Sequence, residues 1–102
     1  MASIYRGTTP ILTIQCDFDI ASCKELYITF QQNKTVLEKR LADVNYVGKV
    51  ITIKFTQEET LMFDDMAGAV FVQIRGTDTH GNAFATNISS MDVNRILKEG
   101  VV

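Results

Sequence analysis

"AVFVQIRGTDTHGNAFATNI", residues 69–88, contains two alternating segments on either side of a turn signal. In its two arms, "AVFVQIR" (69–75) and "AFATNI" (83–88), every second residue is aromatic or β-branched, and these residues lie on one face of each arm. The inward positions of the two arms are Val70, Val72 and Ile74, and Phe84, Thr86 and Ile88. Period-two alternation with β-branched and aromatic residues is typical of half-buried strands. The stretch therefore predicts a β-hairpin.

The turn between these arms holds the only histidine, His80. Asp78 suits the first position of a type I turn, and Gly81 suits the left-handed position that closes it. A three-residue loop then sets Asp78 opposite Asn82, Gly76 opposite Phe84, Ile74 opposite Thr86 and Val72 opposite Ile88. The apolar faces of both arms coincide in this register, and Gly76 leaves room for the Phe84 ring. We predict that His80 is a solvated turn tip.

Similar alternation recurs along the rest of the chain. The further strands predicted are "ILTIQC" (11–16), "ELYITFQ" (25–31), "VITIKF" (50–55) and, as the return arm of a hairpin, "TVLEKR" (35–40). Between two of them, "DFDIASCKE" (17–25) lacks the glycine and the ligand spacing of a calcium loop and predicts a turn or a helical turn.

One short segment indicates a helix. In "TQEETLMF" (56–63), Thr56 and Glu59 have the spacing of a capping box, which predicts a short helical turn near 57–62. The adjacent carboxylates Glu58 and Glu59 point to different faces of such a turn. We expect them to favour the positive end of the helix dipole rather than to act together as acid and base.

Composition excludes several classes of protein. The chain has 102 residues, 46% of them apolar and 22% charged, which predicts one globular domain over residues 1–102. Its net charge is −2 and its largest basic cluster is Lys39-Arg40, so we expect no nucleic-acid partner. No apolar run approaches the roughly 18 residues of a membrane span, and we expect no membrane association. The N-terminal segment lacks a hydrophobic signal core, which predicts synthesis in the cytoplasm.

The sequence offers little for catalysis. Cys16 and Cys23 form an isolated C-x6-C pair that is not a zinc pattern, and they are either two free thiols or a disulfide or redox pair. No nucleophile motif or glycine-rich phosphate loop occurs, and the lone histidine is placed in a turn. We therefore predict a protein that is not an enzyme, with no catalytic residues, metal ligands or cofactor.

Short strands joined by turns, without a long helix, predict an all-β antiparallel sandwich of about seven strands. Several segments of the sequence also resemble those of a known family. "IYRGTTPILTI", "ELYITFQQNKTVLEKR", "TQEETLMF" and "VNRILKEGVV" are similar to segments of small immunoglobulin-like structural proteins of phages and prophages of Gram-positive bacteria. These proteins are similar to the N-terminal domain of phage upper baseplate proteins.

The resemblance implies an immunoglobulin-like β-sandwich that serves as a structural or adaptor protein of a phage tail or baseplate. Its partners would be other phage structural proteins or further copies of itself, and its location the bacterial cytoplasm during assembly and then the virion. One alternative is a binding module for a host-surface saccharide or receptor, for which the aromatic candidates are Tyr5, Tyr27 and Tyr46. Another is a regulatory interaction protein of a mobile element.

The C-terminal segment "MDVNRILKEGVV" carries more apolar residues than a free tail needs. They are Met91, Val93, Ile96, Leu97, Val101 and Val102. They form either a docking interface, by strand addition or apolar burial, or a segment that packs back onto the sandwich. Near the other end, "RGTTP" (6–10) is expected to break a first strand and to switch the chain between sheets.

Overall fold

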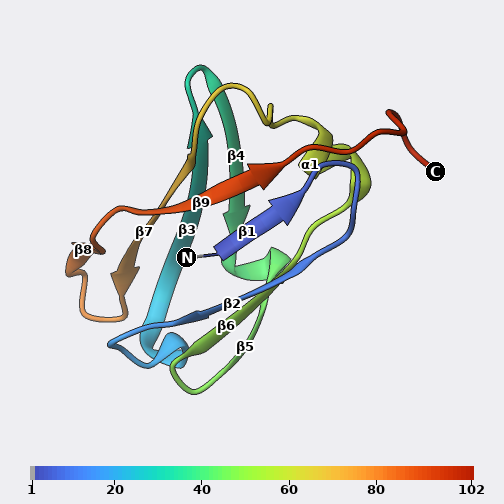
Figure 1. Ribbon diagram of the computed structural model, residues 1–102. Helices are drawn as coiled ribbons and strands as arrows, with labels where there is room; N and C mark the ends of the chain where they lie inside the picture. Colours follow the sequence, from blue (N-terminus) through green and yellow to red (C-terminus); the bar gives the residue numbers. More distant parts are fainter. Residues whose placement is uncertain (1) are drawn as a thin grey trace.

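A computed structural model describes residues 2–102, and within that range the chain forms two facing β-sheets (Figure 1). The strands are β1 (Ala2–Tyr5), β2 (Ile11–Gln15), β3 (Cys23–Gln32), β4 (Thr35–Arg40), β5 (Asn45–Val47), β6 (Val50–Lys54), β7 (Val70–Asp78), β8 (Ala83–Ala85) and β9 (Ser89–Asn94). One sheet has the order β1-β9-β7-β3-β4, with β8 also on β7, and the other has the order β2-β6-β5. The predicted all-β sandwich is confirmed.

The hairpin register is confirmed near the turn. Gly76 pairs with Phe84, and the Asp78 amide donates to the Asn82 carbonyl at 2.9 Å. A Cβ atom on Gly76 would lie 2.5 Å from the Glu25 carbonyl oxygen and 2.9 Å from Cζ of Phe84, so only glycine fits there. His80 is an exposed turn residue, as predicted, and Gly81 has a φ of +84°.

Farther from the turn the predicted register is wrong. The Thr86 amide still donates to the Ile74 carbonyl at 2.9 Å, but Val72 pairs with Ser89 and not with Ile88. The three steps from Thr86 to Ser89 therefore lie opposite the two steps from Ile74 to Val72 in β7. One extra residue is inserted in the second arm, which is a β-bulge. The extra residue reverses the side-chain alternation, so Ile88 is exposed while Met91 and Val93 of β9 enter the core.

The predicted switch between sheets at residues 6–10 is confirmed. β1 pairs with β9 in the larger sheet, and β2 pairs with β6 in the smaller one. The β1–β9 pair is parallel, so the sandwich is not purely antiparallel as predicted. The buried Thr60 hydroxyl fixes this crossover, because it donates to the Thr8 carbonyl at 2.9 Å and accepts from the Thr8 amide at 3.1 Å.

The short helix and the turn before β3 agree with their sequence signals. The helix α1 (Gln57–Leu61) begins at the predicted capping box, in which the Thr56 amide donates to Glu59 and the Glu59 amide donates to Thr56. The segment between β2 and β3 is a turn with the 3-10 helix η1 (Ile20–Ser22), and a second one, η2 (Leu41–Asp43), follows β4.

A single cluster of buried side chains fills the space between the two sheets. Its members are Ile4, Cys16, Ile20, Cys23, Leu26, Ile28, Phe30, Ile51, Ile53, Phe55, Phe63, Val70, Val72, Ile74, Met91 and Val93. The strands predicted at 25–31, 50–55 and 69–75 contribute their inward side chains to this cluster, whereas Leu12, Ile14, Leu37 and Phe84 are partly buried and pack against it.

Turn geometry predicts the effect of substitutions at the hairpin tip. Gly81→Val should lower the free energy of unfolding by at least about 1–2 kcal/mol, because a β-branched side chain is strained at positive φ. The matched control His80→Ala should stay within about 0.5 kcal/mol of the wild type. Urea unfolding of both variants measures the difference, and equal stabilities would contradict the turn.

The helix cap predicts a pH dependence. Burial alone would raise the pKa of Glu59, but the Lys39 ammonium at 2.6 Å and the Thr56 amide together lower it below the usual value. A lowered pKa stabilises the folded state above the ordinary glutamate pKa, and the gain is lost as pH falls through the folded value. Glu59→Gln should therefore destabilise the protein at pH 7, and its difference from the wild type should disappear as pH falls through the folded pKa of Glu59. Glu58→Gln, in the same turn, is the control in the same unfolding series.

Candidate functional site

The C-terminal segment, residues 95–102, follows β9 and runs past α1 (Figure 1). The amide of the Gln57 side chain, in α1, binds both backbone groups of Val102. Its Nε2 donates to the Val102 carbonyl at 3.1 Å, and its Oε1 accepts from the Val102 amide at 2.8 Å. The end of the chain is thereby fixed to a helix 45 residues earlier in the sequence.

Arg6 attaches the same segment to the body of the protein. Its Nε donates to the Phe63 carbonyl at 2.6 Å, and its Nη1 donates to both carboxylate oxygens of Glu99 at 2.7 and 2.9 Å. The Arg6 side chain is largely buried, whereas that of Glu99 is mostly exposed. One guanidinium thus joins the crossover after β1, the end of α1 and the C-terminal segment.

The structure divides the six residues predicted as an interface. Met91 and Val93 are buried in the core and are unavailable to a partner. Ile96 is half-buried, and its Cδ1 lies beside Gly7. Leu97, Val101 and Val102 are exposed by 89, 56 and 83% and form what we call the C-terminal surface.

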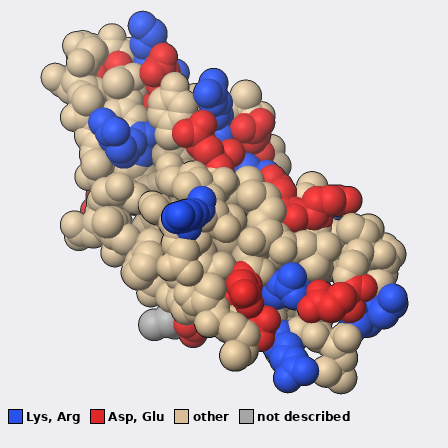
Figure 2. Space-filling model, turned by 90° about the horizontal axis from the view of Figure 1, so that it is seen from above, with Lys and Arg blue, Asp and Glu red and all other residues tan. Residues whose placement is uncertain are grey.

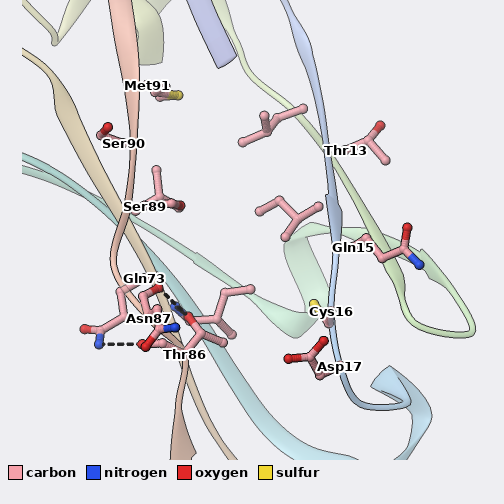
Figure 3. A pocket seen from close by; sticks show the side chains of 14 residues that line it. Thr13, Gln15, Cys16, Asp17, Gln73, Thr86, Asn87, Ser89, Ser90 and Met91 are labelled. Atoms are coloured by element: carbon pink, nitrogen blue, oxygen red, sulfur yellow. Dashed lines mark hydrogen bonds between the residues drawn. The ribbon is translucent and has the colours of Figure 1, made fainter. Parts of the chain in front are cut away.

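A second feature, which the sequence does not predict, is a groove between β2 and the bulged segment that leads into β9. We call it the β2 groove, and it has a volume of about 540 Å³. Leu12 and Ile14 of β2 face Ile74 and Met91 across it. In Figure 3 the side chains of Ser89 and Met91 point into the space, whereas Thr13 and Gln15 point away from it.

The groove continues past Thr86 and Asn87 into a second hollow, beside the Phe18–Phe84 ring pair. Its walls carry the carboxylates Asp17 and Asp78. The Asp78 carboxylate accepts from the amides of His80 and Asn82, and these hydrogen bonds, that from Asn82 first, lower its pKa. Asp78 therefore serves the turn.

Cys16 and Cys23 are free thiols, one in the wall of each hollow. Burial raises the pKa of both, since the charged thiolate loses contact with water, and neighbouring negative groups raise it further. A raised pKa leaves little thiolate at neutral pH, so neither thiol has the environment of an activated nucleophile.

Other classes of site find little support in the described part of the chain. Across residues 2–102, no three His, Cys, Asp or Glu side chains gather as metal ligands, and no helix is long and apolar enough to cross a membrane. On the face seen in Figure 2, lysine and arginine side chains lie scattered among acidic ones and do not form a basic patch.

The three tyrosines do not form a common binding face. Tyr27 lines a shallow hollow with Glu38 and Arg75, and the Arg40 guanidinium lies 5.4 Å from its ring centroid. Tyr5 belongs to β1 in the larger sheet and Tyr46 to β5 in the smaller one.

Comparison with known proteins adds no further assignment. A scan against models of known protein families finds no match for this chain, and a search of curated proteins finds none either.

Because the C-terminal residues are divided between core and surface, two truncations should have different outcomes. Removal of residues 95–102 should leave a folded domain, because the apolar side chains of Leu97, Val101 and Val102 are mostly outside the core. Removal of residues 91–102 should abolish cooperative thermal unfolding. It deletes Met91 and Val93, each worth about 1.5–3 kcal/mol of burial, together with the partner strand of β1. Circular dichroism melts distinguish the two, and a cooperative melt after the longer truncation would contradict the assigned core.

Proposed function

We propose that the protein is a non-enzymatic structural or adaptor protein of a phage or prophage, of the tail or baseplate, that acts through protein–protein contacts. The observation that carries the proposal is the C-terminal surface. Leu97, Val101 and Val102 expose apolar side chains on a segment that Gln57 and Arg6 attach to the body of the protein.

Such a surface has the physical properties of a docking site. Apolar side chains gain free energy when a partner removes them from water, at roughly 25 cal/mol per Å² of buried area. A segment that is already attached at Glu99 and Val102 loses less conformational entropy on binding than a free tail would. Both effects favour association with another protein.

The strand order supports an immunoglobulin-like assignment. In variable-type domains, one sheet contains the order G-F-C-C′ and the other contains B, E and D. Here β9-β7-β3-β4 corresponds to the first order and β2-β6-β5 to the second. This agreement, with the resemblance of the sequence to small phage structural proteins, favours a virion component that is made in the bacterial cytoplasm.

The alternative, a module for a host-surface saccharide or receptor, has weaker support. Sugar rings stack on exposed aromatic faces, and the Arg40 guanidinium already lies over Tyr27. Tyr5 and Tyr46 lie in different sheets and do not extend the hollow around Tyr27.

Incorporation into particles tests the proposed function. In the bacterium that encodes the chain, an epitope-tagged copy should sediment with purified phage particles after induction. Leu97→Asp and Val102→Asp should reduce its amount in particles at least tenfold, because a carboxylate in an apolar contact must be desolvated. The variant proteins should keep the thermal midpoint of the wild type.

The matched control is Val47→Asp in β5, since Val47 is exposed by 84%, as much as Val102. This variant should enter particles like the wild type. Absence of the wild-type chain from particles would contradict the phage assignment, and equal loss with Val47→Asp would contradict the C-terminal surface as its docking site.

A further inference from the structure

The edges of the two sheets differ in how they are protected against pairing with another strand. Soluble proteins protect edge strands by charge, proline or short length. The edge strand β4 carries Glu38, Lys39 and Arg40, whereas the edge strands β1, β5 and β8 have only four, three and three residues. The remaining edge strand, β2, is "ILTIQ", five residues without a charge.

The hydrogen-bond pattern shows which backbone groups of β2 are open. The Cys16 amide donates to the Lys49 carbonyl at 2.8 Å, and the Phe55 amide donates to the Pro10 carbonyl at 3.1 Å. Antiparallel ladders bond alternate residues, so the even positions of β2 bond to β6. The amides and carbonyls of Ile11, Thr13 and Gln15 therefore face the open edge.

The inward side chains of β2 are incompletely buried. Leu12 and Ile14 pack against the core, yet both also line the β2 groove and are only partly buried. An open row of backbone donors and acceptors beside an apolar groove matches the chemistry of one occupant, an extended polypeptide strand. The strand would bond to β2 through its backbone and cover the groove with alternate side chains.

We propose that this occupant is β2 of a second copy of the chain, paired antiparallel about Thr13 in a two-fold symmetric dimer. In this register Thr13 lies opposite Thr13 of the second copy, and Leu12 lies opposite Ile14. The aliphatic side chains of both copies then meet on the groove side, and the two three-stranded sheets join into one of six strands. A two-fold axis requires this self-complementarity, and the sequence of β2 provides it.

The charges around β2 are compatible with the same arrangement. No charged residue of one β2 faces another across the joint, because residues 11–15 are uncharged. Antiparallel pairing also brings opposite charges to the same end. Asp17, just beyond Gln15, comes to the end of the second copy at which Lys54 pairs with Ile11. The proposal does not depend on the proposed virion function.

The mass of the protein in solution tests the dimer. Sedimentation equilibrium of the full chain should give a reversible dimer, with twice the 11.4 kDa mass of one chain. Thr13→Pro removes an amide that faces the open edge and leaves the ladder to β6 intact. Thr13→Lys places two like charges opposite each other at the symmetry axis. Each variant should raise the dissociation constant at least tenfold, because each substitution enters the interface twice.

The control is Val36→Lys, which adds the same charge to an exposed position of the edge strand β4 and should leave the dimer unchanged. Thermal midpoints close to that of the wild type establish that all three variants fold. A wild-type chain that stays monomeric at millimolar concentration would overturn the proposal, and so would a dimer that both Thr13 variants leave intact. Neither result bears on particle incorporation through Leu97 and Val102.

Discussion

The arrangement of the larger sheet follows from β7, which pairs with three other strands at once. β7 bonds to β3 along one edge, and it must accommodate both β8 and β9 along the other. At one end of β7, the backbone of β3 and the Phe84 ring come so close to Gly76 that a side chain would not fit there. At the other end the partner strand needs one extra residue, and the bulge at 86–88 supplies it.

This bulge determines where the surfaces of the protein lie. By reversing the alternation it turns Met91 and Val93 into the core, and β9 can then hold β1 in a parallel pair. It also takes Asn87 and Ile88 out of the regular ladder, and Asn87, with the neighbouring Thr86, becomes part of the wall of the β2 groove. The same inserted residue therefore determines which side chains of β9 enter the core and which residues line the groove.

Local patterns in the sequence predicted the elements whose signals are local. The hairpin tip, the capping box at Thr56 and the inward faces of four strands follow from turn chemistry and period-two alternation alone. The bulge was missed because "AFATNI" continues the alternation to Ile88, and only the competing burial of Met91 decides against it. The β2 groove could not be predicted, since alternation does not reveal which strand lies at an edge. The contacts of Arg6 with Phe63 and Glu99 join residues distant in sequence, for which no motif exists.

The two surfaces also have different consequences for assembly. The β2 groove and the C-terminal surface share no residue, because the first is built from β2 and the segment around the bulge, and the second from residues 97–102. A dimer joined through β2 would therefore carry two C-terminal surfaces related by its two-fold axis. If one of them bound a lattice of partner proteins, as we propose, the other would bind at a high effective concentration, and individually weak contacts would then give stable attachment. A chain of this size could in this way act as a connector without a large interface of its own.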